Sequence, residues 1–202
     1  MKIVGVHTLV SCGAYSRSKH WAKTRAQIRT AVRRCAWPPG SKKFTIYPQS
    51  GKKRGEGNGV GPIRREFVAE LKRRGWVIEG AAKNALGQSL GDFDAVLPGP
   101  VKPIVAEWET GNISSSHKSI NKLAMLLADR IISAGTLIVP SRKLYAFLTD
   151  RIGNIQELEP YFRLWRSVPC REGVLEIVVI EYDAQSYDVP KIPKMTAGRS
   201  AS

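Results

Sequence analysis

The sequence predicts an α/β fold in which a central mixed β-sheet is flanked by helices. Segments whose apolar residues alternate, as in strands, interleave along the chain with segments whose apolar residues recur every three or four positions, as in helices. Two strand segments, at residues 92–97 and 103–109, are joined by a turn and form a hairpin. The chain has 202 residues, of which 43% are hydrophobic. We therefore expect a single domain, residues 1–202, with an adequate core.

The elements before residue 84 are predicted from their periodicity and from the residues that end them. Trp21, Ile28 and Val32 recur at helical spacing, and Trp37-Pro-Pro-Gly40 ends that helix. A second helix has Pro62 near its start and Gly75 at its stop. The predicted order is a strand at 1–10, a helix at 17–35, a helix at 62–74 and a strand that begins at 76–79.

The later elements follow the same logic. After the hairpin, a serine among residues 114–116 caps a helix whose inner face carries Ile120, Leu123 and Leu127. Residues 187–202 are rich in Pro, Lys and Ser and are expected to form a flexible tail. The predicted order is a helix at 114–132, a buried strand at 135–140, helices at 141–148 and 157–166, and a hydrophobic strand at 174–182.

The net charge of +15 is confined to the first two-fifths of the chain. Residues 1–83 hold 19 Lys and Arg against 4 acidic residues, whereas residues 84–202 hold 13 of each sign. Such asymmetry indicates a polyanionic partner, and nucleic acid is the commonest one. We expect residues 1–83 to form a DNA-binding region, and the Gly-rich loop at 50–61 to order on a phosphate backbone through Lys52, Lys53 and Arg54. The alternative is a surface loop with no such role.

Composition excludes several other classes of protein. Cys12, Cys35 and Cys170 are odd in number and lack CxxC spacing, which argues against a disulfide framework and a zinc site. No apolar run is long enough to cross a membrane. The first ten residues are expected to form a strand and not a signal peptide, and a reducing cytoplasm fits best. His7 and His20 are too dispersed for a zinc site and are expected to be structural.

Two glutamates in the second hairpin strand are the main candidates for chemistry. Glu107 and Glu109 are two residues apart and therefore project from one face of a strand, and Asp94 lies roughly opposite Glu107 if the hairpin folds near Gly99. Three carboxylates on one sheet edge repel one another unless they share a cation, and hard oxygen ligands suit Mg²⁺. A shifted register would instead put Asp92, on the same strand face as Asp94, opposite Glu109. A lone Glu-x-Glu is more often a solvated strand face.

Polar residues on neighbouring helices add candidates. The helix after the glutamates carries donors on its outer side that we expect to lie next to the acids and to hold a phosphate or position water. The alternative for Lys122 is an ordinary exposed helix lysine. Glu66 or Glu70 is a candidate to assist the carboxylates, and each fits equally well as a partner of a nearby arginine or lysine. The donors are His117, Lys118, Asn121 and Lys122.

The segment Glu107-Trp-Glu-Thr-Gly-Asn112, followed by a helix with Asn121-Lys122, resembles the active-site segment of BamHI/BglII-type type II restriction endonucleases of the PD-(D/E)xK nuclease superfamily. The pattern Phe67-x3-Leu71-x3-Gly75-Trp76 resembles the helix that precedes this core. The likeness covers residues 62–140, which would be the catalytic core.

The resemblance implies a restriction-endonuclease-like fold in which Asp94, Glu107 and Glu109 are the catalytic, metal-binding carboxylates, with Glu109 where most of the superfamily has lysine. It implies Mg²⁺-dependent cleavage of double-stranded DNA at a short palindrome by a homodimer, with no membrane and no small-molecule cofactor. Two alternatives remain open: a repair or junction nuclease on the same fold, and a non-catalytic nucleic-acid-binding protein whose acids are structural.

Overall fold

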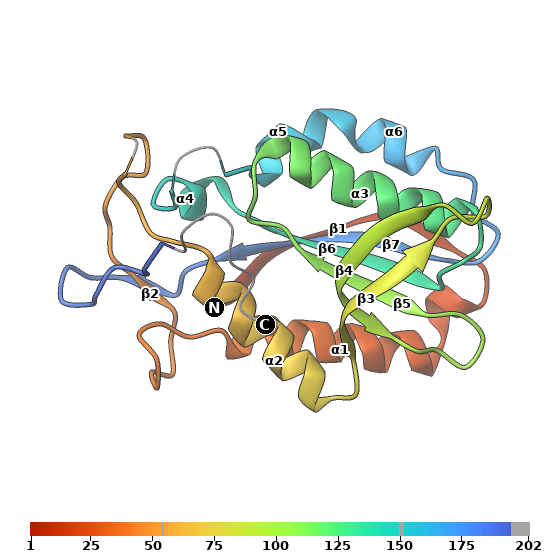
Figure 1. The fold of residues 1–202 in the computed structure, drawn as a ribbon, viewed down its shortest axis with the longest axis horizontal. Helices are drawn as coiled ribbons and strands as arrows, with labels where there is room; N and C mark the ends of the chain where they lie inside the picture. Colours follow the sequence, from red (N-terminus) through yellow and green to blue (C-terminus); the bar gives the residue numbers. More distant parts are fainter. Residues whose placement is uncertain (54, 150–151, 195–202) are drawn as a thin grey trace.

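A computed structural model describes residues 1–53, 55–149 and 152–194. A six-stranded sheet with the order β1-β7-β6-β5-β4-β3 forms its centre, and helices cover both faces (Figure 1). The predicted mixed sheet flanked by helices is therefore confirmed. The strands are β1 (Lys2–Cys12), β2 (Thr45–Ile46), β3 (Val77–Lys83), β4 (Ser89–Leu97), β5 (Ile104–Trp108), β6 (Ala134–Pro140), β7 (Gly173–Glu181) and β8 (Ala184–Gln185).

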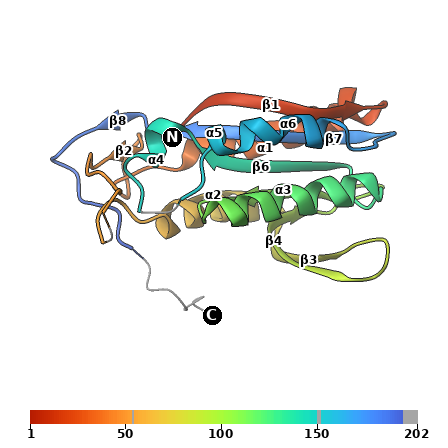
Figure 2. The same ribbon diagram turned by 90° about the horizontal axis from the view of Figure 1, so that it is seen from above.

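The helices divide between the two faces of the sheet. In Figure 1, α1 and α2 lie on one side, and α3, α5 and α6 lie on the other, whereas Figure 2 shows the β3–β4 hairpin extending away from the main body. The helices are α1 (Lys19–Arg34), α2 (Gly61–Arg73), α3 (Ile113–Ala128), α4 (Arg142–Tyr145), α5 (Ile155–Leu158) and α6 (Phe162–Arg166), with 3₁₀ turns η1 (Tyr15–Arg17) and η2 (Glu159–Tyr161).

The sheet is parallel in the middle and antiparallel at its edges. β5, β6 and β7 run parallel, whereas β1 pairs antiparallel with β7, and β3, β4 and β5 form antiparallel pairs. Side-chain alternation along the central strand β5 builds two cores: Ala106 packs in the cluster with α1 and α2, and Val105 packs in the cluster with α3. Glu107 shares the face of Val105, so the sheet directs it toward α3.

Three predicted helices are shorter than expected, and the one predicted at 114–132 ends at Ala128. Residues 157–166 are not one helix, because Pro160 lacks a backbone N–H and lies in the 3₁₀ turn between α5 and α6. The helix predicted at 141–148 forms one α-helical turn, capped by Ser141. The short parallel pair of β2 and β8 was not predicted, because two-residue strands carry no periodicity.

The Gly-rich loop packs against the body, contrary to the expectation of a segment too polar to pack. A Cβ on Gly51 would lie 1.5 Å from the Leu148 carbonyl oxygen, so the backbone approaches too closely for any side chain. Asn58 is fully buried, and its amide group donates to the carbonyls of Tyr47 and Phe147. Lys52 and Lys53 remain exposed, whereas Arg54 lies outside the described residues.

The expected flexible tail is anchored as far as it is described. Ile192 is 1% exposed, and its N–H donates to the Asn58 side chain, which differs from the expectation of a tail that frays from Tyr187. Residues 195–202 lie outside the described part. Cys12, Cys35 and Cys170 are free thiols. Within the described ranges, no helix is long and apolar enough to cross a membrane.

Candidate active site

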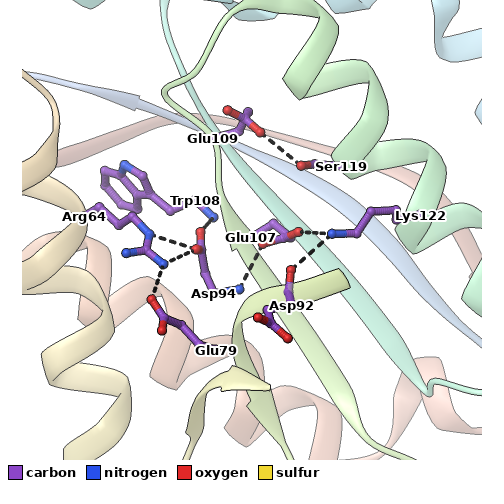
Figure 3. A network of polar contacts seen from close by, with 9 residues as sticks. All are labelled: Arg64, Glu79, Asp92, Asp94, Glu107, Trp108, Glu109, Ser119 and Lys122. Atoms are coloured by element: carbon purple, nitrogen blue, oxygen red, sulfur yellow. Dashed lines mark hydrogen bonds and ion pairs between the residues drawn. The ribbon is translucent and has the colours of Figure 1, made fainter. Parts of the chain in front are cut away.

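Asp94 and Glu107 meet where strand β4 separates from β5. The regular pairing of the two strands ends at Ala95 and Ala106, and the next pair in the same register is Asp94 with Glu107. Here the side chains accept the backbone hydrogen bonds: Glu107 Oε2 accepts from the N–H of Asp94 at 3.0 Å, and Asp94 Oδ2 accepts from the N–H of Trp108 at 2.7 Å (Figure 3). This exchange fixes both carboxylates against the backbone of the opposite strand.

Glu107 is a buried carboxylate whose charge is only partly balanced. The residue is 6% exposed, and Lys122 Nζ from α3 lies 3.1 Å from its Oε1. Burial raises the pKa of Glu107, and the negative charge of Asp94 raises it further, while the Asp94 N–H and Lys122 oppose the rise. The site therefore favours an additional positive charge beside Glu107.

Asp94 is held from the other side by α2. Arg64 donates from Nε to Asp94 Oδ1 at 2.8 Å, and its terminal nitrogen lies 2.6 Å from the same oxygen. The guanidinium also lies 3.6 Å from Glu79, an exposed glutamate on β3 whose φ of 56° is unusual for a residue with a side chain. Arg64 thus links three elements, α2, β3 and β4 (Figure 3).

Glu109 does not join the other two carboxylates. Its Oε1 accepts from the Gly111 N–H at 2.6 Å, and its Oε2 accepts from the Ser119 hydroxyl at 3.0 Å. Burial raises the pKa of Glu109, these two donors oppose the rise, and the more distant charges of Asp94 and Lys122 raise and lower it respectively. Among the described residues, no group of three or more His, Cys, Asp or Glu side chains is close enough to hold a metal ion. The expected convergence of three carboxylates is therefore correct for Asp94 and Glu107 but not for Glu109.

Helix α3 turns only part of its polar residues toward these acids. Lys122, with 12% of its side chain exposed, reaches Glu107 and the Asp92 carbonyl, and its ammonium lies 4.0 Å from the Phe93 ring centre. His117 and Asn121, one turn apart, face α6 instead: His117 packs its ring 4.5 Å from that of Tyr161, and Asn121 accepts from Trp165. The expectation that His117 and Asn121 lie next to the acids is wrong.

The comparisons with known proteins place this geometry in a family. A sequence model described as "Restriction endonuclease BamHI" matches residues 1–199. The chain belongs to the BamHI family of restriction endonucleases. It is 42% identical over 174 residues to the type II restriction enzyme OkrAI of Oceanobacter kriegii, covering 86% of this chain and 87% of that protein. It is 31% identical over 194 residues to the type II restriction enzyme BamHI of Bacillus amyloliquefaciens, covering 92% and 86%. The prediction of a type II site-specific deoxyribonuclease is confirmed.

A solved structure supports the fold of this BamHI-family enzyme. The crystal structure of the restriction endonuclease BglII complexed with a DNA 16-mer superposes with a TM-score of 0.62, at 10% identity, over 91% of this chain and 79% of that one. The predicted restriction-endonuclease-like core is thereby confirmed.

The remaining candidates of the BamHI-family chain have other environments. Asp92 is exposed, and its carboxylate points away from Lys122 (Figure 3). Glu70 is buried, and Arg73 and Arg74 bind its two oxygens, so that both arginines lower its pKa. Glu66 lies exposed on α2. The structure therefore places neither helix glutamate beside Asp94 and Glu107.

The described cationic candidates are exposed and lie on two parts of the enzyme's surface, on α3 and on the Gly-rich loop. Lys118 is exposed on α3, with no ion pair or hydrogen bond recorded for its ammonium among the described residues. Lys52 borders a cavity of about 660 Å³ between the Gly-rich loop and α4, which Arg142 and Tyr145 also line. Lys53 is exposed beside it.

Sequence reasoning missed two residues of the site, Arg64 and Ser119. Ser119 lies four residues before Leu123, so it continues the inner stripe of α3, and a small polar residue on a buried stripe is a signal that could have identified it. Arg64 gave no such signal, because it lies 30 residues from Asp94 and meets it only through the packing of α2.

Proposed function

We propose that this enzyme cleaves double-stranded DNA at a short palindromic site, as a homodimer, with Mg²⁺ held by Asp94 and Glu107 and assisted by Glu109. One observation carries the proposal. Asp94 and Glu107 lie opposite each other, each carboxylate accepts a backbone N–H from the other strand, and burial raises the pKa of Glu107. A buried carboxylate pair with excess negative charge is a suitable seat for a hard divalent cation.

The donor chemistry fits such an ion. Carboxylate oxygens suit Mg²⁺, which, when bound, polarises a phosphate oxygen and lowers the pKa of a bound water. Arg64 and Lys122 contact Asp94 Oδ1 and Glu107 Oε1, so a cation at the pair shares these carboxylates with them or displaces them. Glu109, oriented by Ser119 and by the Gly111 N–H, is our candidate for positioning the attacking water as a base.

The proposed DNA contacts come from the basic region, residues 1–83, and from helix α3, which follows the glutamates. Lys52 and Lys53 on the Gly-rich loop and Lys118 on α3 are exposed and are available for phosphates. Arg54 stays a candidate that lies outside the described residues. We propose a homodimer because a two-fold dimer would present two equivalent active sites to the two strands of a palindrome. The BglII endonuclease was solved in complex with a DNA 16-mer, which supports DNA as the partner.

Plasmid cleavage tests the proposal. Purified enzyme with Mg²⁺ is expected to give discrete fragments, and chelation of the metal is expected to stop cutting. Glu107→Ala should abolish cleavage while it leaves salt-sensitive DNA binding, because the change removes a metal ligand and no phosphate contact. Glu66→Ala, which removes an exposed acid from α2, is the matched control and should cut normally.

The pattern of cutting decides between the proposal and its alternatives. A smear without preferred ends would point to a nuclease of low specificity, and cleavage by Glu107→Ala would remove Glu107 from the mechanism. Sequencing the fragment ends gives the recognition site.

A further inference from the structure

Helix α1 carries a one-sided stripe of positive charge. Its 16 residues include six cations and no acidic residue. At about 100° per residue, four of the cations fall within roughly a third of the helix circumference. Exposed alanines at 22 and 26 lie between them, so a partner can approach the helix backbone closely. The four exposed cations, which we call the α1 stripe, are Lys19, Lys23, Arg33 and Arg34.

The other two cations of α1 have a different task. Arg25 and Arg29 are half-buried and turn toward Glu176, which is 1% exposed on β7: burial raises the pKa of Glu176, and the charges of Arg29 and Arg25 oppose the rise. The fold therefore balances the charges that face its interior and leaves the α1 stripe unbalanced. Among the described residues, no ion pair or hydrogen bond is recorded for the side chains of the α1 stripe.

Helix α1 packs on the face of the sheet opposite to the one from which Glu107 projects. Ile28 and Val32 pack α1 into the core cluster that contains Ala106, whereas Glu107 projects from the other face of β5 toward α3. Figure 1 shows α1 and α3 on opposite sides of the sheet. A duplex of about 16 base pairs is far shorter than the DNA persistence length of about 150 base pairs, so it cannot bend around the molecule to touch both places.

The neighbouring end of α2 extends the basic surface. Trp76, just after α2, donates to Gln27 at 3.0 Å and holds this end of α2 against the middle of α1. Lys72 is exposed there, and the acid of that turn, Glu70, is already bound by Arg73 and Arg74. The C-terminal end of α2 thus offers cations without a free carboxylate, which suits a phosphate backbone. The exposed carboxylate of Glu66 lies nearer the other end of the stripe, where it borders the same small cavity as Arg34.

We propose that the α1 stripe binds the backbone of a second segment of duplex DNA, separate from the segment that is cleaved. The inference rests on the proposed function in that DNA is the substrate. Contacts to phosphates carry no sequence information, so this surface holds the enzyme on DNA of any sequence. On long DNA it raises the local concentration of further segments, whereas on a short duplex that fills the active site it has nothing to bind.

The test compares two quadruple variants with equal loss of charge. The stripe variant is Lys19→Gln/Lys23→Gln/Arg33→Gln/Arg34→Gln, and glutamine keeps helix propensity. The control variant is Lys83→Gln/Arg130→Gln/Arg163→Gln/Arg171→Gln, in which four exposed cations are scattered over other elements. Each phosphate contact contributes about 0.9 to the slope of log affinity against log salt. The stripe variant should lose up to about 3.6 of that slope on long DNA without the site, and the control should lose less than about 1.

Cleavage of a short duplex that contains the recognition site separates the two proposals. The stripe variant should cut it at the wild-type rate, while its cutting of long DNA at limiting enzyme falls. An unchanged salt slope would overturn the inference, and an equal loss on the short duplex would assign the stripe to the cleavage surface. A wild-type enzyme that binds long DNA but cuts neither substrate would reject the proposed function instead. If the quadruple variant unfolds, two double variants replace it in the test, and each is expected to lose about half as much of the salt slope. They are Lys19→Gln/Lys23→Gln and Arg33→Gln/Arg34→Gln.

Discussion

At the scale of single residues, the positive charge of Lys122 helps to determine how readily Glu107 ionises. Its ammonium lies 3.1 Å from Glu107 Oε1 and 3.3 Å from the Asp92 carbonyl oxygen, and only 12% of its side chain is exposed. Burial raises the pKa of Glu107, and Lys122 is one of the groups that hold the rise in check. The pH range in which Glu107 is an anion therefore depends on a side chain from a different element.

Replacing Lys122 tests this dependence. In Lys122→Met the favourable charge is lost, so the pKa of Glu107 rises further and the carboxylate ionises only at higher pH. We expect the acid limb of the cleavage rate against pH to move to higher pH, with the largest loss of rate at low pH. Lys118→Met, which removes an exposed lysine of the same helix, should leave the limb in place. A general loss of rate with an unmoved limb would contradict the role given to Lys122.

At the scale of elements, alternation predicted the site better than it predicted the ends of helices. The strand period placed Glu107 and Glu109 on one face, and the hairpin register brought Asp94 to Glu107. The same pattern did not predict that the side chains of Asp94 and Glu107 accept hydrogen bonds from the backbone of the opposite strand. The sequence does not show at which residue the pairing of two strands ends. Glu109 lies beyond the last residue of β5, where the Gly111 N–H and Ser119 decide its direction.

Strand β7 carries a buried acid, Glu176, whose charge is felt by Arg29 and Arg25 of α1. Burial raises its pKa above the ordinary value of 4.5. The folded state therefore holds the proton more tightly than the unfolded chain, and stability falls as pH rises from 4.5 through the folded-state pKa. Glu176→Gln has no charge to bury, so we expect its melting temperature to exceed that of the wild type near about pH 8 and the gap to narrow toward about pH 5.

Thermal melts across this pH range measure the gap, with exposed Glu159→Gln as the control that should show none. Glu176→Gln should also cut DNA at the wild-type rate, since Glu176 lies on the face of the sheet away from Glu107. A difference in melting temperature that widens as pH falls would contradict a raised pKa for Glu176.

Over the whole molecule, long-range contacts that no local pattern reveals hold the periphery together. Asn58 joins three distant segments, since its side chain bonds to Tyr47, Phe147 and Ile192. The glycines around it predicted a mobile phosphate loop, because composition cannot distinguish a flexible glycine from one that permits close packing. Gly59 is of the second kind, as a Cβ there would lie 2.1 Å from the Pro193 carbonyl oxygen.

Removing the Asn58 side chain should therefore loosen all three segments. In Asn58→Ala, the Tyr47 carbonyl and the Ile192 N–H lose their partner, at about 1–3 kcal/mol for each buried group. We expect the free energy of unfolding in urea to fall by at least about 2 kcal/mol. Asn84→Ala, which removes exposed hydrogen bonds at the tip of the β3–β4 hairpin, should cost less than about 1 kcal/mol. Equal losses in the two variants would contradict the central position of Asn58.

The proposed homodimer needs a surface on which two copies meet, and α3 with α6 offers one. Tyr161 and Leu164 expose 48% and 61% of their surface, and Met125 on α3 exposes 38%. The ring contact of His117 with Tyr161 and the bond from Trp165 to Asn121 hold the two helices together, so these apolar side chains form one patch. A two-fold axis through the patch would bury it and pair two active sites.

A single charge in this patch should separate the copies. Leu164→Asp places a carboxylate where two identical surfaces meet, so each dimer would bury two like charges, and we expect a monomer in sedimentation velocity at concentrations where the wild type is a dimer. Cutting of both plasmid strands should fall with dissociation. Leu86→Asp changes a leucine that is 82% exposed at the hairpin tip, and it should stay dimeric. A dimer that survives Leu164→Asp would move the interface elsewhere, and a monomeric wild type that cuts both strands would exclude the homodimer.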